Sequence, residues 1–198
     1  KNFDANSDSY ETTFHEIDVG CQACHGPGAN HVEWADREKE GETNRDVDYY
    51  GLLVDFKNTD ARFQVESCAP CHSRRAPIRE DWAHTGRYHD YFRLQTLSEN
   101  LYHPDGQILD EVYVFGSFLQ SRMYEQGVRC TDCHNPHSLQ FWVSGNALCT
   151  QCHQPQAIPD FPSLKQKEYE SPEHHFHPED SEGAKCVNCH MPERTYMV

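Results

Sequence analysis

The hydrophobic and polar positions of this chain follow a helical pattern most clearly over residues 110–127, DEVYVFGSFLQSRMYEQG. Apolar side chains recur there at near-helical spacing, at Val112, Phe115, Leu119 and Met123. The pattern predicts a helix that Asp110 can cap and Gly127 can end. Gly116 in its middle weakens such a helix relative to alanine, which predicts the close approach of something flat at that point.

Other stretches predict shorter elements. Residues 31–41, HVEWADREKEG, predict a short helix that stops at its glycine, and residues 145–153, GNALCTQCH, predict a helical turn. Residues 1–20 are polar, with ANSDS typical of a turn, and residues 154–183 hold five of the eleven prolines, which predicts an extended loop. No run alternates as a strand does. We expect mostly irregular loops with a few short α-helices and little β-structure.

The chain has a low content of hydrophobic residues from which to build a core. Hydrophobic residues make up 36% of the 198 residues, and the mean hydropathy is -0.87. A protein-only core of this length normally needs more apolar surface than that. The chain therefore needs another source of buried apolar surface, and its cysteines indicate what that source is.

All ten cysteines fall in five C-x-x-C-H motifs. The motifs are CQACH from Cys21, CAPCH from Cys68, CTDCH from Cys130, CTQCH from Cys149 and CVNCH from Cys186. Structural zinc sites use pairs of C-x-x-C and do not require a histidine after each pair, and five is an odd number. A disulfide framework scatters its cysteines, because bridges between distant segments constrain the unfolded chain most. The repeated spacing disfavours both alternatives.

C-x-x-C-H is the attachment signature of c-type haem. The two sulfurs form thioethers with the porphyrin, and the adjacent histidine is held where it reaches the iron. The motifs predict five covalently attached haem c groups, bound by Cys21, Cys24, Cys68, Cys71, Cys130, Cys133, Cys149, Cys152, Cys186 and Cys189. The predicted proximal iron ligands are His25, His72, His134, His153 and His190.

The expected architecture is a multihaem cytochrome c, with residues 1–198 forming a single pentahaem domain. The haems would supply much of the buried apolar surface, and aromatic residues, 12% of the chain, would pack against them. The intervals between motifs are irregular, so the haems would form an irregular array and not a repeat structure.

Histidines outside the motifs are numerous enough to give each iron a second axial ligand. They are His15, His31, His84, His89, His103, His137, His174, His175 and His177. His137 follows proximal His134 by three residues, which span about 10 Å at most. The chain cannot pass round a porphyrin within that length, so His137 is predicted to bind a different haem. The same reasoning applies, less strongly, to His31, six residues past His25.

Eight of these nine histidines are candidates for the distal position. The main candidates are His31, His103, His137, His175 and His89, and the weaker ones are His15, His174 and His177. Each single histidine has the alternative of a solvated or packing imidazole.

The charge balance limits the partners. The formal net charge is -15, from 17 Lys+Arg against 32 Asp+Glu. Nucleic acid is excluded, because phosphate contacts need a basic face. An acidic surface fits simple solubility, and also the steering of a basic redox partner or the binding of bridging cations.

The attachment chemistry predicts the compartment. Thioether attachment takes place outside the cytoplasm, so we expect an extracellular, cell-surface or periplasmic protein. No stretch reaches the roughly 18 apolar residues that cross a bilayer. The chain starts at Lys1 without a signal peptide, and we therefore expect a processed product or part of a longer precursor.

The motifs lie in longer segments that are more specific than C-x-x-C-H alone: EIDVGCQACHGPGANHVEWA, CAPCHSRRAPIRED, LYHPDGQILDEVYVFGSFLQSRMY, CTDCHNPHSL, GNALCTQCH and KCVNCHMPERTYMV. These segments resemble bacterial multihaem c-type cytochromes whose haem domain precedes tetratricopeptide repeats. The resemblance implies bis-histidine haems in stacked and perpendicular pairs, and it supports His31, His103, His137 and the 174–177 cluster as ligands. Family members have further haem motifs and helical repeats beyond this chain, and His15 falls outside the family pattern.

Two classes of function fit these features. An electron carrier or conduit passes electrons along closely packed bis-histidine haems and needs no catalytic residue. A multihaem oxidoreductase acting on a small nitrogen compound needs an open iron position. All five motifs are complete and spare histidines exceed need, which favours the conduit over an enzyme.

The assembly has two alternatives. The protein could be a monomeric periplasmic shuttle that meets redox partner proteins. Alternatively, copies could join head to tail in an extracellular conductive filament, with His15 of one copy binding a haem of the next. Because of the charge, such a filament would need ligand bonds or bridging cations at its interfaces.

Overall fold

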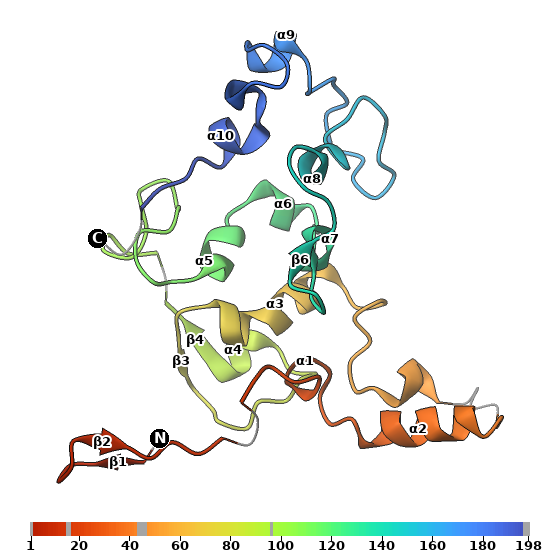
Figure 1. Ribbon diagram of the computed structural model, residues 1–198, viewed down its shortest axis with the longest axis vertical. Helices are drawn as coiled ribbons and strands as arrows, with labels where there is room; N and C mark the ends of the chain where they lie inside the picture. Colours follow the sequence, from red (N-terminus) through yellow and green to blue (C-terminus); the bar gives the residue numbers. More distant parts are fainter. Residues whose placement is uncertain (1, 15–16, 43–46, 96, 196–198) are drawn as a thin grey trace. The chain divides into compact units, whose positions relative to one another are not determined.

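The computed structural model describes residues 2–14, 17–42, 47–95 and 97–195 (Figure 1). Contacts within the polypeptide divide it into two compact units. Unit 1 comprises residues 1–59 and 79–91, and unit 2 comprises residues 60–78 and 92–198. The single pentahaem domain expected from the sequence stays a prediction, because these contacts are those of the polypeptide alone.

Unit 1 consists of short helices and one hairpin. Its elements are β1 (Phe3–Asp4), β2 (Ser9–Tyr10), α1 (Gln22–His25), α2 (Ala29–Lys39), the 3-10 turn η1 (Asp48–Gly51) and α4 (Tyr88–Tyr91). β1 and β2 pair antiparallel around the predicted turn, where Asp4 accepts hydrogen bonds from Asn6 N and Ser7 Oγ at 2.9 Å each. α2 confirms the helix predicted over residues 31–41, and it packs against η1.

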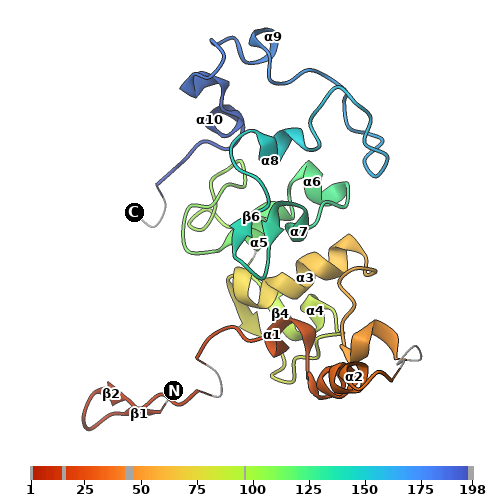
Figure 2. The same cartoon turned by 45° about the vertical axis from the view of Figure 1, so that its right-hand side comes forward.

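Unit 2 carries the remaining elements on long connecting loops (Figures 1 and 2). They are α3 (Ala61–His72), β3 (Arg75–Pro77), β4 (Phe92–Leu94), α5 (Val114–Phe118), α6 (Arg122–Glu125), α7 (Cys130–Cys133), β5 (His134–Asn135), β6 (Gln140–Phe141), α8 (Ala147–Thr150), α9 (Pro172–His175), η2 (Glu182–Ala184) and α10 (Cys186–His190). Asp60 caps α3 by accepting from Phe63 N at 2.7 Å, and α3 packs against α5. β3 pairs antiparallel with β4, and β5 with β6.

The prediction of one continuous helix over residues 110–127 is wrong, because the structure has two short helices there, α5 and α6. α5 and α6 are separated at Ser121, which has an extended backbone and accepts a hydrogen bond from Tyr124 N at 3.1 Å as the N-cap of α6. Asp110 does not cap a helix but pairs with Arg74 at 3.0 Å. Gly127 does follow the last turn, with a φ of 83°. A side chain that caps its own helix start competes with continuation of the preceding helix.

Gly116 has a close neighbour, as predicted, and the neighbour is the phenol of Tyr102. A methyl group at Gly116 would overlap the Tyr102 hydroxyl. Tyr102 belongs to a small buried cluster with Leu101 and Val112. The flat group against this helix is therefore a side chain of the same unit.

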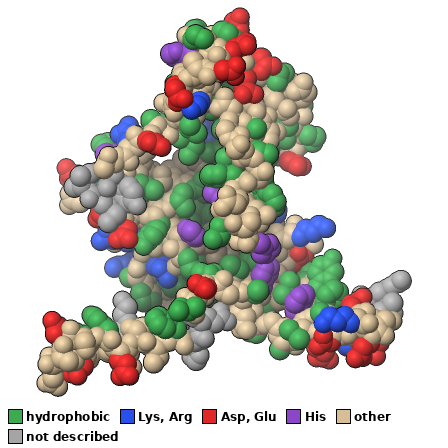
Figure 3. All heavy atoms as spheres, in the orientation of Figure 1, with side chains coloured by type: hydrophobic (Ala, Val, Ile, Leu, Met, Phe, Trp, Pro, Cys, Tyr) green, Lys and Arg blue, Asp and Glu red, His purple; other side chains and the backbone are tan. Residues whose placement is uncertain are grey.

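The polypeptide buries few of its large hydrophobic side chains. Within the described ranges, ten hydrophobic residues are buried, whereas twenty-two large ones are exposed. Figure 3 shows hydrophobic and histidine side chains open to solvent on the face drawn, with acidic side chains gathered around the α9 end of unit 2. Covering apolar surface stabilises a fold by roughly 25 cal/mol per Å². The exposed side chains are thus available to a large apolar cofactor. Of the helices described, none combines the length and the apolar character that a bilayer crossing requires.

Candidate haem-attachment sites

Each C-x-x-C-H motif lies on a helical turn. The motifs are found on α1, at the end of α3, on α7, on α8 with the turn after it, and on α10. Backbone hydrogen bonds close these turns, for example from His25 N to Cys21 O at 3.0 Å and from His153 N to Cys149 O at 2.9 Å. Residues three and four apart share one face of a helix, so a turn presents both thiols and the histidine on the same side. This is the arrangement that attachment to one porphyrin edge needs. The motif at residues 130–134 differs in that His134 already begins β5 with an extended backbone.

The cysteines do not form a cluster of metal ligands. All ten lie in described ranges, and their thiols are in the reduced form. The described residues contain no group of three or more His, Cys, Asp or Glu that would hold a metal ion. A structural zinc site needs four converging ligands.

Three proximal candidates contact an aromatic side chain. His25 lies edge-on to Phe56 with ring centres 5.3 Å apart, His134 lies 4.6 Å from Phe141, and His153 lies edge-on to Tyr169 at 5.7 Å. Packing of this kind limits the rotation of an imidazole, which helps to hold it in the direction of a ligand.

His174 and His190 form the pair that most resembles two axial ligands. His174 lies on α9 and proximal candidate His190 lies on α10, and their ring planes are parallel within 4° with centres 6.1 Å apart. Imidazoles on opposite faces of one metal have centres about 6 Å apart, since a metal–nitrogen bond is about 2.0 Å and the ring centre lies about 1 Å further. The distance between the ring centres therefore matches that of a bis-histidine site. The rings themselves are stacked, so both imidazoles would have to turn a nitrogen toward the other to share one iron.

The sequence favoured His175 in this cluster, with His174 and His177 as weaker candidates. The structure brings His174 next to His190 instead. His175 Nδ1 accepts a hydrogen bond from His177 N at 3.2 Å, and the His177 ring lies against Gly183. Neighbouring residues on a helical turn point in different directions, and sequence position alone does not show which one faces a partner.

The protonation of His174 bears on its role. Burial, followed by the charges of Lys167, His190 and His175, lowers the pKa of His174, which keeps the imidazole neutral as a metal ligand must be. Lys167 Nζ lies 3.2 Å from His174 Nδ1, so Nδ1 accepts and Nε2 carries the proton. Binding of iron through Nε2 requires the other tautomer. Lys167 would therefore have to turn away from Nδ1 for Nε2 to hold an iron.

His31 is held in the tautomer that binds metal through Nε2. Its Nδ1 lies 2.7 Å from the Tyr50 carbonyl oxygen, which only accepts, so Nδ1 carries the proton. The ring also stacks on Trp34, with centres 5.6 Å apart and planes at 16°. Metal-binding histidines commonly donate their second N–H to a carbonyl, which fixes the ring and raises its basicity. The sequence carries no signal for a backbone carbonyl of this kind.

His103 has a nitrogen that needs a partner. The residue sits in a turn in which His103 N donates to Gln107 O at 2.8 Å and Gly106 N donates to His103 O at 2.9 Å. Within the described structure, Nε2 is buried and has no hydrogen-bond partner. Such a group costs about 1–3 kcal/mol. A bond to iron would remove this cost.

The other candidates lie on exposed segments. His137 is in the turn between β5 and β6, where its backbone N–H donates to Asn135 Oδ1 at 3.0 Å. His89 is on α4 with its ring edge-on to Tyr88 at 5.0 Å. His15, on which the filament hypothesis depends, lies outside the described residues.

Comparison with known proteins gave no relative: the chain matches no protein-family model, no curated protein and no solved structure. The resemblance to multihaem cytochromes therefore stays a prediction. The functional proposal rests on the residues of this chain and their geometry.

Proposed function

We propose that this chain is a c-type cytochrome that carries electrons through haems attached at its five C-x-x-C-H motifs. The observation that carries the proposal is the pair of parallel imidazoles of His174 and His190, spaced as two axial ligands of one iron. His190 directly follows the thiols of Cys186 and Cys189 on α10. One segment therefore presents two sulfurs and two imidazoles in the combination that haem c requires.

Other described residues are also suited to binding a haem. The buried Nε2 of His103 lacks a partner, and His31 offers Nε2 in the tautomer suited to iron. Exposed apolar side chains lie close in sequence to a motif, with Leu139 at 84% and Phe141 at 55% exposed. They provide surface that a porphyrin would cover.

Haem c with two histidine ligands supplies one-electron exchange and offers no open iron position to a substrate. The chain's residues do the remaining work. Helical turns present pairs of thiols for covalent attachment, and imidazoles oriented by Tyr50 and by aromatic contacts would bind the iron. Exposed apolar side chains would keep water from the attached groups.

The test is covalent stoichiometry in protein made by a host that attaches haem c. The intact mass should exceed the 23.0 kDa chain by five haems, and acid-acetone should not extract them. A mass equal to that of the bare chain would overturn the proposal. All irons should be low-spin and bind carbon monoxide poorly, whereas rapid binding at one haem would favour the oxidoreductase alternative.

A further inference from the structure

The four motifs of unit 2 are linked to one another in sequence order. We propose that haems attached at residues 68–72, 130–134, 149–153 and 186–190 form one row in this order, and that Asn146 is a positioning residue for the last two. The inference rests on the proposed function. It adds the order of the haems in space, which the spacing of the motifs along the sequence does not give. Polar contacts join each pair of successive motifs, either directly or through residues just before a motif.

The first link joins α3 to α7. Thr131, inside the second of these motifs, donates from its hydroxyl to Gln64 Oε1 at 2.8 Å. Gln64 is buried on α3, one turn before Cys68. The thiols of the two motifs also meet, since a hydrogen bond with Cys68 lowers the pKa of Cys130.

The second link joins α7 to the motif at residues 149–153. Gln151 Nε2 donates to the Asp132 carbonyl oxygen at 3.2 Å.

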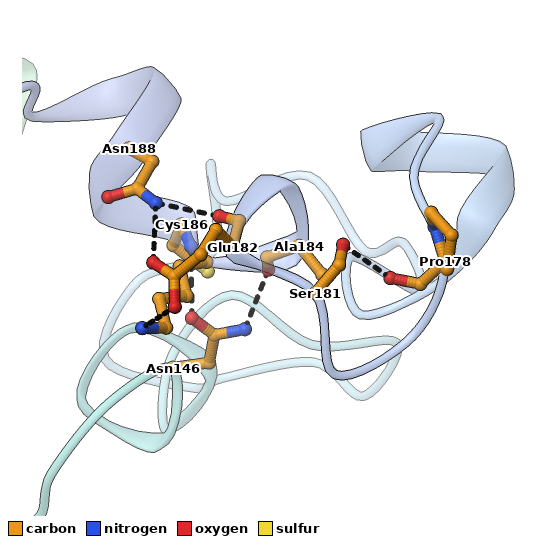
Figure 4. Close-up of polar contacts among 8 residues, drawn as sticks. Asn146, Pro178, Ser181, Glu182, Ala184, Cys186 and Asn188 are labelled. Atoms are coloured by element: carbon orange, nitrogen blue, oxygen red, sulfur yellow. Dashed lines mark hydrogen bonds and ion pairs between the residues drawn. The ribbon is translucent and has the colours of Figure 1, made fainter.

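The third link is made by Asn146, which uses both ends of its amide on the backbone beside Lys185 (Figure 4). Nδ2 donates to Ala184 O at 2.9 Å, and Oδ1 accepts from Cys186 N at 2.9 Å. Asn146 occupies the N-cap position of α8, but its side chain makes no cap hydrogen bond there. Burial, and then the charge and hydrogen bond of Cys186, raise the pKa of Cys149.

Tyr169 gives a second, independent contact between the last two motifs. Its ring lies edge-on to His153 with centres 5.7 Å apart, and edge-on to His174 at 5.1 Å. His153 is the proximal candidate of one motif, and His174 faces His190 of the next. One phenol ring therefore touches a ligand candidate from each.

Asn146→Ala in the full-length holoprotein tests the positioning role. The mass should still show five haems, because all cysteines are kept. The oxidised protein should lose the interaction-broadened EPR signal of the last two haems and gain the signal of an isolated low-spin haem. Asn146→Asp keeps the acceptor for Cys186 N and removes the donor to Ala184 O, and a smaller loss is expected.

Asn188→Ala is the matched control. Asn188 lies in the last motif and donates to Glu182 O at 2.6 Å within the same segment. Its removal should leave the EPR spectrum unchanged. An unaltered spectrum in both Asn146 variants, or an equal loss in Asn188→Ala, would overturn the positioning role.

A structure of the wild-type holoprotein tests the order independently of any variant. The expected result is that the haems at residues 149–153 and 186–190 are neighbours. The proposed order is overturned if they are not adjacent. A wild-type mass that lacks haem would overturn the proposed function itself. The two failures are therefore distinguishable.

Discussion

The imidazole rings of His174 and His190 lie parallel, with centres 6.1 Å apart. The relationship comes from the local fold of the C-terminal segment, because α9 and α10 both contact η2, which lies between them in the sequence. The distance between the ring centres equals that of two axial ligands of one iron. This makes His174 the distal residue for which the structure gives the most direct test.

Replacing His174 by alanine should convert one haem from low to high spin. The intact mass should differ from that of the wild-type holoprotein only by the change of side chain, because no haem is lost. The thioethers at Cys186 and Cys189 do not depend on the sixth ligand. EPR and optical spectra of the oxidised protein measure the change. His175→Ala is the control, and it should keep every haem low-spin. The assignment fails if His174→Ala stays fully low-spin or if His175→Ala gives the high-spin signal.

Gly51→Ala should raise the reduction potential of one haem by disturbing His31. Gly51 has a φ of 75°, and a Cβ there would lie 2.5 Å from the Asn30 carbonyl oxygen, so the turn must move away from α2. The bond from His31 to Tyr50 O then weakens, which lowers the basicity of the imidazole and favours the reduced iron. A potentiometric titration measures the shift.

Gly41→Ala is the control for Gly51→Ala. Gly41 also has a positive φ, 81°, but its Cβ would meet nothing within 4 Å. Backbone strain is therefore similar in the two variants, and only Gly51→Ala pushes on α2. Equal shifts in both variants would show that strain, and not the His31 hydrogen bond, changes the potential.

His137→Ala should also produce one high-spin haem, at a different iron from that of His174→Ala. His137 lies in an exposed turn, so its removal should not alter the fold. The double variant should then contain two high-spin haems, which quantitative EPR can count. Ser138→Ala, in the same turn, serves as the control. A fully low-spin spectrum in His137→Ala would make this residue an ordinary turn histidine.

Gly116→Ala should destabilise the holoprotein by about 1–3 kcal/mol through overpacking against Tyr102, in spite of the better helix propensity of alanine. Tyr102→Phe should be neutral or stabilising, because within the described structure the Tyr102 hydroxyl is buried without a hydrogen-bond partner. Thermal unfolding of the two single variants and the double variant gives the coupling between the sites. Additive effects would contradict the contact.

Local features of the fold were predictable where neighbouring residues decide them. The turn at ANSDS and the helix around Trp34 depend on side chains within a few positions, and both were predicted. α3 was not predicted, because the residues leading into it carry little periodicity and Pro70 lies inside the helix. The break at Ser121 was missed because apolar periodicity does not report a side chain that caps a new helix.

The proposed chemistry of attachment follows from the sequence alone. Within each C-x-x-C-H motif, the spacing along one helical turn is enough to put two thiols and an imidazole on one side, and composition alone shows that the chain needs added apolar surface. These are properties of five consecutive residues or of the whole chain, and they do not depend on what lies beside each motif.

The contacts between residues far apart in the sequence could be read only from the tertiary structure. The preference for His174 over His175, the carbonyl of Tyr50 behind His31, and the Asn146 link between two motifs all join segments that are separate in the sequence. A change of one position along a helical turn rotates a side chain by about 100°. The direction of a histidine is therefore fixed by the packing of its element against others, which no local pattern records.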